Sequence, residues 1–310
     1  MPIVVVGTVF VDIKGFPEDL YIPGGRNAGS VQFVHGGVGR NVAEDIANVE
    51  LRPVFVSMVD DSAQGEAVLE KLRKHRVNTD YIVKADNGMG MWLAVFDETG
   101  DVVGSISKRP DMGPMAELLD EKGDEIFSAA DSVVVEVDLD REVVKRVLRL
   151  ARKYGKKVFA VVANMSIATQ RRDQLQDIDC IICNVQEAGI LFVDDFEGLS
   201  PEEMREALSK HLMNAAFPAM VVTMGSQGSV YADRFGMSGV QPAGNVVVRD
   251  TTGAGDAFCA GVTIGLTYGK SMPEAVLIGT KLASSVITVA ENVCPRFRPR
   301  EFGLDIVPED

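Results

Sequence analysis

The sequence predicts an α/β protein, a doubly wound three-layer α/β/α sandwich whose central sheet is mostly parallel. Three observations support this class. Short apolar runs alternate with segments of helical period, which is the order of a parallel sheet with crossover helices. The 310 residues are enough to bury one large core, and 46% of them are hydrophobic, an ordinary share for a globular protein. We therefore expect a single domain over residues 1–310 with a small accessory sheet.

The alternation begins close to the N-terminus. Residues 3–6 form an apolar run that predicts a strand, and residues 38–49 carry apolar side chains every three or four positions, which predicts a helix. A strand over residues 54–59 and a helix over residues 63–72 repeat the unit. A strand over residues 133–137 resumes the alternation of strands and helices.

The middle of the chain continues the pattern. The helix expected over residues 201–212 follows the sequence SPEE, which combines a capping box with proline at the first helical position. The other elements expected here are a helix over residues 142–153 and strands over residues 158–162, 178–183, 220–223 and 229–232.

The C-terminal part contains the most informative segment. Residues 245–249 (NVVVR) predict a strand, residues 257–268 a mostly buried helix, and a further helix begins at residue 273. The intervening sequence DTTGAGDA, residues 250–257, then places two glycines at a strand-to-helix turn.

This turn is suited to bind an anion. The unpaired N–H groups and the positive end of the helix dipole favour negative charge, and Gly253 and Gly255 let a phosphoryl group approach without a Cβ clash. Asp256 beside that anion is unfavourable unless it accepts a proton from an attacking hydroxyl. The alternative is a tight turn in which the aspartate caps the helix.

Two stretches lack the strand-helix alternation. Residues 11–34 contain proline and glycine without a helical period, and residues 90–112 predict a hairpin around residues 98–101. We expect both to form short antiparallel strands set off from the main sheet. Such a sheet could be a lid, a decorative extension or an oligomer contact.

Composition excludes several classes of function. The formal net charge of −14 argues against a nucleic-acid partner or an anionic membrane surface, because both select for basic faces. No apolar run reaches the length of a membrane span, and the N-terminal residues lack a basic leader, so we expect a cytoplasmic protein.

The cysteines and histidines do not predict a metal or disulfide site. Cys180 and Cys183 form a C-x-x-C, but in a strand they point to opposite faces and cannot share a metal. Four cysteines in a chain of this length indicate reduced core residues. The three histidines are scattered in the sequence.

The sequence DTTGAGDAF from residue 250 resembles the signature of the ribokinase family, also called the PfkB carbohydrate kinases. A second motif, GGVGRNVAE at residues 36–44, resembles the N-terminal signature of the same family. No Walker-type G-x-x-x-x-G-K-[ST] occurs, and no complete G-x-G-x-x-G follows the first strand. The resemblance implies a ribokinase-like fold, transfer of phosphate from ATP with Mg²⁺ to a small sugar or nucleoside, and a β lid formed by about residues 11–34 and 90–112.

The resemblance also implies roles for individual residues. The catalytic base would be Asp256, and the turn of Gly253, Ala254 and Gly255 would stabilise the transferred phosphoryl group. The expected contacts to the sugar are Asp12, which we place at the end of the first strand, with Gly36, Gly37, Asn41 and Asp138. From the residues alone, Asp138 could equally be a solvated loop acid or a helix cap.

Further matches lie on the nucleotide side. Glu187 belongs to an N-x-x-E pattern that in the family bears on magnesium, which it would contact through water, although the spacing is also that of an ordinary helix start. Asp250 and Thr252 match positions that in many members help to hold K⁺. The expected ATP-binding residues are Asn184, Thr223, Gly225 and Gly228.

The form G-G-V-G-R-N-x-A-E resembles the bacterial pseudouridine kinases, and the hairpin MWLAVFDETGDVV is similar to the lid of that branch. Residues 107–110 and 162–165 depart from the branch pattern. Pseudouridine is therefore the expected acceptor, at its primary 5′-hydroxyl, with ribokinase, fructokinase or another sugar or nucleoside kinase as the alternative. A catalytically silent metabolite sensor is the alternative from a different class, and the lid is a candidate homodimer face.

Overall fold

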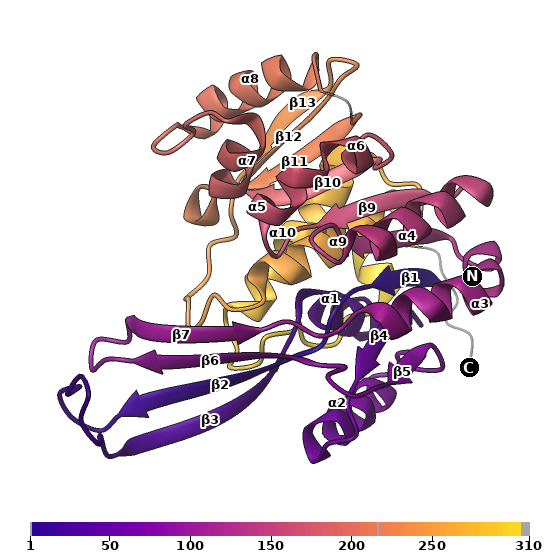
Figure 1. The fold of residues 1–310 in the computed structure, drawn as a ribbon. Coiled ribbons are helices and arrows are strands. Elements are labelled where there is room, and N and C mark those ends of the chain that lie inside the picture. Colours follow the sequence, from indigo (N-terminus) through magenta and orange to yellow (C-terminus); the bar gives the residue numbers. More distant parts are fainter. Residues whose placement is uncertain (1, 216, 305–310) are drawn as a thin grey trace.

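The computed structural model describes residues 2–215 and 217–304. In these residues the strands form one nine-stranded sheet and a separate four-stranded sheet, and helices cover the large sheet on both faces (Figure 1). The predicted three-layer α/β/α sandwich is therefore confirmed.

The large sheet is parallel over most of its width. Its strands are β1 (Ile3–Val6), β4 (Val54–Val59), β5 (Ile82–Lys84), β8 (Ser132–Glu136), β9 (Lys157–Val161), β10 (Cys180–Asn184), β11 (Ala219–Thr223), β12 (Ser229–Asp233) and β13 (Ser238–Gln241). Over the described residues their order is β13-β12-β11-β10-β9-β8-β1-β4-β5, and only the pairs that involve β12 are antiparallel. Strand β1 lies between β4 and β8, where the strand order reverses. Doubly wound folds bind ligands at such a point, outside the carboxyl ends of the strands.

The helices form two layers. They are α1 (Val38–Asn48), α2 (Ala63–Lys74), α3 (Gly113–Ser128), α4 (Arg141–Lys153), α5 (Met165–Ala168), α6 (Arg172–Leu175), α7 (Val185–Phe192), α8 (Pro201–Leu212), α9 (Ala254–Thr267) and α10 (Met272–Val286). Helices α1, α2, α9 and α10 share one buried apolar cluster with the sheet, and α3, α4, α7 and α8 share the other. Helix α9 packs against both α1 and α10.

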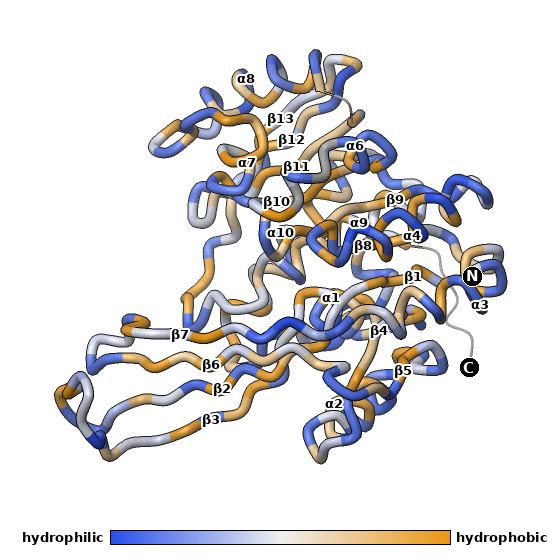
Figure 2. Tube along the Cα trace, in the orientation of Figure 1, coloured by the Kyte–Doolittle hydropathy of each residue, from blue (hydrophilic) through white to orange (hydrophobic). Residues whose placement is uncertain are grey.

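The alternation of side chains along the strands explains the two clusters. In β1, Val4 and Val6 lie in one cluster, whereas Ile3 and Val5 lie in the other. A strand buried on both faces needs a continuous apolar run, and the strands of the large sheet are mostly hydrophobic in Figure 2. Cys180 and Cys183 also divide between the clusters, so they point away from each other, as the sequence predicted.

The small sheet projects from the sandwich (Figure 1). Its strands, in spatial order, are β3 (Gly29–Gly36), β2 (Phe10–Pro17), β6 (Gly90–Phe96) and β7 (Val102–Lys108). Pairs β2–β3 and β6–β7 are antiparallel, as expected. Strands β2 and β6 are instead parallel, and they begin side by side, where the Gly90 N–H donates to the Val9 carbonyl.

The register separates the two faces of the small sheet. Asp12 lies opposite Val34 on one side and Trp92 on the other, and directly opposed residues share a face. The other face is apolar and carries Ile13, Phe33, Leu93 and Ile106 in one row.

The strand predicted over residues 245–249 is wrong. This segment has no strand pairing, and Val247 is 88% exposed. Three consecutive valines favour β structure only when another strand pairs with them, and here the segment is instead held at its end by a hydrogen bond from Arg249 N–H to the Ile287 carbonyl, at 2.7 Å. The glycine turn therefore follows an exposed extended segment, and α9 begins at Ala254, three residues earlier than predicted.

None of the helices in the described parts of the chain is both long enough and apolar enough to cross a membrane.

Candidate active site

The turn before α9 is built around Gly253. This residue is the helix N-cap with φ of +81°, and a Cβ on it would collide with the main-chain carbonyl of Asn292. Both facts require glycine. At Gly255, in contrast, a Cβ would meet nothing within 4 Å, so the surface above this residue is open to a ligand.

The N–H groups of the turn are only partly available. The Ala254 N–H donates to the Thr251 carbonyl at 3.2 Å, so the expected role of this group as a phosphate donor is wrong for this conformation. Within residues 2–215 and 217–304, the N–H groups of Gly255 and Asp256 have no hydrogen-bond partner. These two groups lie at the positive end of a 14-residue helix, an arrangement that favours an anion.

Asp256 is half-buried in the first turn of α9. Burial raises the pKa of its carboxyl to about 7, while a hydrogen bond from Asn41 and the charge of Arg40 act in the opposite direction. A carboxylate with a pKa near the working pH is suited to general base catalysis. The side chain is therefore desolvated and still within reach of an acceptor hydroxyl.

Asn41 brings the two sequence motifs together. Its Nδ2 donates to Asp256 Oδ2 at 2.6 Å across 215 residues of sequence. Its Oδ1 is buried without a hydrogen-bond partner among the described residues, which leaves an acceptor for a hydroxyl donor. Two motifs that are far apart in the sequence therefore meet at one hydrogen bond.

Asp12 is not at the end of the first strand, as the sequence suggested, because β1 ends at Val6 and Asp12 lies within β2 of the small sheet. Burial raises the pKa of Asp12, and the nearby Lys14 and Arg40 charges oppose this rise. A Cβ on Gly36 would lie 2.8 Å from Asp12 Oδ2, so the carboxylate lies directly against the glycine pair that begins α1.

Glu136, which the sequence analysis missed, lies beneath the same glycines. The N-cap of α1 is Gly37, which has no side chain, and the carboxylate of Glu136 replaces it by accepting from Gly39 N–H and from both N–H and Oγ1 of Thr8. Burial first, then the Asp138 charge, raises the pKa of Glu136 to about 8. An acidic residue inside the run VVVEV was the available signal, since buried strands rarely contain one without a partner.

Asp138 is neither solvated nor a helix cap. It is buried, and its Oδ1 accepts from the Ala163 N–H at 3.1 Å. Arg109 Nη2 donates to the Asp138 carbonyl at 2.7 Å and lies 3.7 Å from its carboxylate. The N-cap of α4 is Asp140. Burial raises the pKa of Glu187, and the negative charge of Asp138 raises it further. The two carboxylates therefore lie on the same side of the molecule.

Three of the four predicted ATP-binding residues line one pocket of about 380 Å³: Asn184, Thr223 and Gly225. Gly228 is not among the lining residues; its φ is +96° and it packs against the Gln241 carbonyl. A neighbouring pocket of about 540 Å³ lies between residues 241–246 and helix α10.

Asn184 and Glu187 form a reciprocal capping box at the start of α7. Each backbone N–H donates to the side chain of the other residue at 2.8 Å. Of the two Glu187 oxygens, Oε1 accepts no hydrogen bond from the described residues. Asp250 and Thr252 form a local turn in which the Thr252 N–H donates to Asp250 Oδ1 at 2.8 Å. In the described parts of the chain, no three His, Cys, Asp or Glu side chains cluster as metal ligands.

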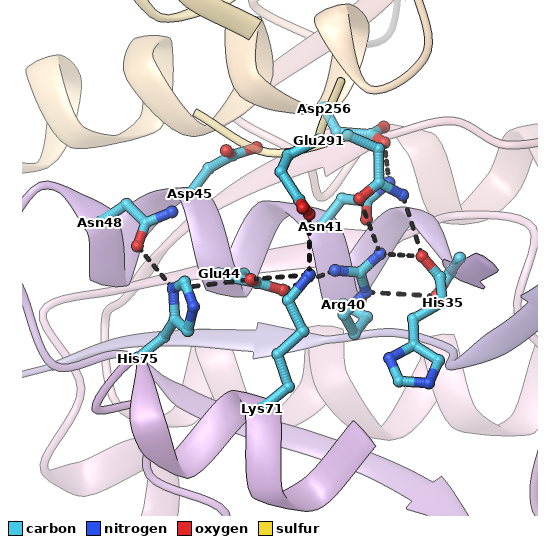
Figure 3. Close-up of polar contacts among 12 residues, drawn as sticks. His35, Arg40, Asn41, Glu44, Asp45, Asn48, Lys71, His75, Asp256 and Glu291 are labelled. Carbon is cyan, nitrogen blue, oxygen red and sulfur yellow. Dashed lines mark hydrogen bonds and ion pairs between the residues drawn. The ribbon is translucent and has the colours of Figure 1, made fainter. Parts of the chain in front are cut away.

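A buried polar cluster on α1 was also missed as a structural unit. Arg40 and Glu44 lie one helical turn apart, and Figure 3 shows that their contacts extend to His35, Lys71 and His75. The sequence analysis used Arg40 only as part of a motif, because the partners of this residue are distant in sequence.

The comparisons with known proteins agree with this geometry. A profile of the pfkB family carbohydrate kinases matches residues 2–293. The guanosine-inosine kinase of Exiguobacterium acetylicum is 37% identical over 294 residues, which cover 94% of this chain and 95% of that protein. The pseudouridine kinase of Escherichia coli (strain K12) is 26% identical over 289 residues, which cover 92% and 90%. Among solved structures, Arabidopsis thaliana ribokinase complexed with ribose and ATP matches with a TM-score of 0.83 at 24% identity, and the match covers 99% of each chain.

Proposed function

Because this chain belongs to the pfkB family of carbohydrate kinases, we propose that it transfers the γ-phosphate of ATP to the primary 5′-hydroxyl of a nucleoside. One observation carries the chemistry: the 2.6 Å hydrogen bond between Asn41 and Asp256 joins the acceptor motif to the anion turn. A hydroxyl held by Asn41 Oδ1 then lies beside both the base and the phosphate donors.

The residues divide the reaction between them. Asp256 accepts the proton of the 5′-hydroxyl as its oxygen attacks the γ-phosphorus. The N–H groups of Gly255 and Asp256 stabilise the charge that develops on the transferred group. Asp12, with the glycine pair that begins α1, holds the sugar hydroxyls, and Asp138 fixes the edge of the same site.

The nucleotide occupies the pocket lined by Asn184, Thr223 and Gly225. Glu187 fits a water-mediated role towards Mg²⁺, because its free Oε1 is a hard oxygen donor and this metal usually keeps several of its waters. When bound, Mg²⁺ supplies charge neutralisation at the phosphates. Asp250 and Thr252 are the proposed neighbours of a K⁺ ion, and the small sheet is the proposed lid that excludes water.

The face of the small sheet that carries Asp12 favours a nucleoside over a free sugar. Trp92 lies directly opposite Asp12 in the next strand, and neighbouring strands are about 4.8 Å apart. Phe96 contacts Trp92 edge-to-face at 6.5 Å and stacks on Phe16 at 4.6 Å. A ribose held by Asp12 therefore places its base beside an aromatic platform, where stacking is worth about 1–3 kcal/mol per base.

Guanosine and inosine rank first among the nucleosides, because the guanosine-inosine kinase shares 37% of aligned residues and the pseudouridine kinase 26%. Pseudouridine, which the N-terminal motif predicted, ranks second. A 6-oxopurine and a pyrimidine both stack on an aromatic ring, so the platform alone does not choose between them.

The test is an ADP-release assay with Mg²⁺ and K⁺ over guanosine, inosine, pseudouridine, adenosine, ribose and fructose. We expect kcat/KM for guanosine or inosine to exceed that for ribose by at least about tenfold, from the stacking energy. Faster turnover of a free sugar would contradict the nucleoside assignment and leave the kinase intact. Absence of turnover with every acceptor, combined with nucleoside binding, would indicate a catalytically silent sensor.

A further inference from the structure

Helix α1 contains a fully buried ion pair. Arg40 is 1% exposed and Glu44 0%, and Arg40 Nη1 lies 2.5 Å from Glu44 Oε2. Figure 3 shows the guanidinium at the centre of a network of polar contacts. Arginine is rarely buried to this degree unless it is fully paired.

Arg40 connects two segments that are far apart in sequence. Its Nε donates to the Gly36 carbonyl at 3.4 Å, and its Nη2 donates to the His35 carbonyl and, at 3.3 Å, to Asn292 Oδ1. Asn292 Nδ2 in turn donates to the same His35 carbonyl at 2.9 Å. The end of β3 and the segment after α10 are thus joined through one side chain.

Both segments border the reaction site. The end of β3 leads into the glycines that lie against Asp12, and the main-chain carbonyl of Asn292 lies where a Cβ of Gly253 would be. The next residue after Arg40 is Asn41, which holds Asp256. Two consecutive residues of α1 therefore hold the phosphate turn in two ways: Arg40 through Asn292, and Asn41 through Asp256.

We propose that Arg40, oriented by Glu44, is a positioning residue that aligns the acceptor glycines with the phosphate turn and its base. This inference rests on the proposed kinase activity. It assigns no contact between Arg40 and substrate.

A purely stabilising role explains the pair poorly. Desolvation makes buried ion pairs weak contributors to stability, and replacing both partners by apolar residues is often neutral. Glu44 is also imperfectly paired: among the described residues its Oε1 accepts no hydrogen bond and has only long ion contacts, at 3.4 Å to Lys71 and 3.5 Å to His75. Arg40 donates to the carbonyls of two consecutive residues, His35 and Gly36. The planar guanidinium can bind both at once, which the single ammonium group of lysine cannot reproduce.

The same charge acts on the base. Burial raises the pKa of Asp256, and Asn41 and Arg40 lower it. The other charged or titratable groups that face Asp256 are Glu187 on α7, Asp45 on α1 and Cys259 on α9. Without the Arg40 charge the carboxyl ionises at higher pH, so the acidic limb of the kcat/KM profile moves to higher pH.

The experiment compares Arg40→Met, Glu44→Leu, the double variant and Arg40→Lys, with the best acceptor of the panel. We expect the double variant to unfold at nearly the wild-type temperature and to show the shifted acidic limb. We also expect its kcat to fall by about 10²-fold, because a displacement of the reacting groups by about 1 Å can cost this much. Arg40→Lys keeps the charge, so it loses kcat without a shifted limb, which provides a test even if Arg40→Met fails to fold.

A matched control is the pair Glu142 and Arg146 on the solvent side of α4, which has the same i,i+4 spacing and is 64% and 24% exposed. Glu142→Leu with Arg146→Met is expected to leave kcat unchanged. A stable Arg40→Met/Glu44→Leu variant with wild-type kcat and an unmoved limb would overturn the inference. A wild-type protein that turns over no acceptor would instead contradict the proposed function, so the two failures are distinguishable.

Discussion

Asp256 meets two requirements that oppose each other in most carboxylates. In the proposed reaction it must be accessible to a hydroxyl, and it must be desolvated enough to hold a proton near neutral pH. Its position in the first turn of α9 satisfies both, because the side chain is half-buried and accepts a hydrogen bond from Asn41.

Replacement of Asp256 by Asn keeps the shape and the acceptor for Asn41 but removes the base. We expect kcat to fall by roughly 10²- to 10⁴-fold with ATP binding retained. The kcat/KM of the wild type should decrease as the pH is lowered through about 7, because protonation of Asp256 removes the base. Single-turnover rates with an ATP-binding titration check this, and near-normal turnover by the variant would exclude Asp256 as the base.

Gly253 and Gly255 provide a matched pair of substitutions. Gly253→Ala forces a Cβ into the Asn292 carbonyl at positive φ, so we expect a loss of about 2 kcal/mol in the free energy of unfolding. Gly255→Ala meets open space, so stability should be unchanged while the KM for ATP rises or kcat falls. Urea unfolding and steady-state kinetics separate the two effects. Unchanged KM for ATP and kcat in Gly255→Ala would show that the open space at Gly255 is not a ligand site.

Trp92 is the single tryptophan of the chain, which makes its environment observable by fluorescence. Stacking of a nucleobase on Trp92 should quench this signal, whereas ribose should leave it unchanged. For Trp92→Leu we expect the KM for the preferred nucleoside to rise by about tenfold or more and the KM for ribose to stay constant. A parallel rise for both acceptors would show that Trp92 acts on the sugar or on the lid.

At the scale of elements, the junction of β8 and α1 depends on one buried acid. A carboxyl whose folded pKa is raised, here that of Glu136 to about 8, contributes stability below its unfolded pKa and loses it as pH rises to the folded value. We expect Glu136→Gln to be within about 1 kcal/mol of the wild type at pH 5 and to exceed it by about 4–5 kcal/mol at pH 9. Denaturant unfolding at the two pH values measures this. If the free energies of unfolding of the variant and the wild type differ by the same amount at both pH values, ionisation of Glu136 is not involved.

The sequence predicted the regular elements better than their exceptions. The alternation of strands and helices is visible because buried parallel strands are continuously apolar and helices repeat every three to four residues. Helix α3 was not predicted: Pro114 stands at its start, and Gly123, which packs against the side chain of Leu150 on α4, lies within it. The strand at residues 245–249 was predicted from β-branched residues that find no partner.

The site shows the same division. The glycine turn, Asp256 and Asn41 could be proposed from the sequence because each belongs to a local motif. Glu136 and Asn292 were not, because their roles arise from hydrogen bonds across roughly a hundred or more residues of sequence. Local periodicity contains no information about such pairs.

At the scale of the molecule, the small sheet leaves one apolar face uncovered. Ile106 is 69% exposed and Phe33 57%, and both stand in one row on the face opposite Asp12. Exposed apolar rows of this kind mark interaction surfaces, and we expect this face to form a homodimer contact. Ile106→Lys should shift the protein from dimer to monomer in light scattering after size exclusion. Ser107→Lys, on the Asp12 face, is the control, and a wild-type monomer at high concentration would contradict the expectation.

The packing of α9 has a consequence for biosynthesis. One of the two apolar clusters contains residues from Ile3 to Leu304, and α9 and α10 lie on the same face of the sheet as α1. During translation, β1 and α1 emerge about two hundred residues before the helices that complete their side of the sheet. A chain truncated before Asp250 therefore exposes this face, and it also lacks Asp256 and the glycine turn. We expect such a truncated chain to be prone to aggregation and inactive.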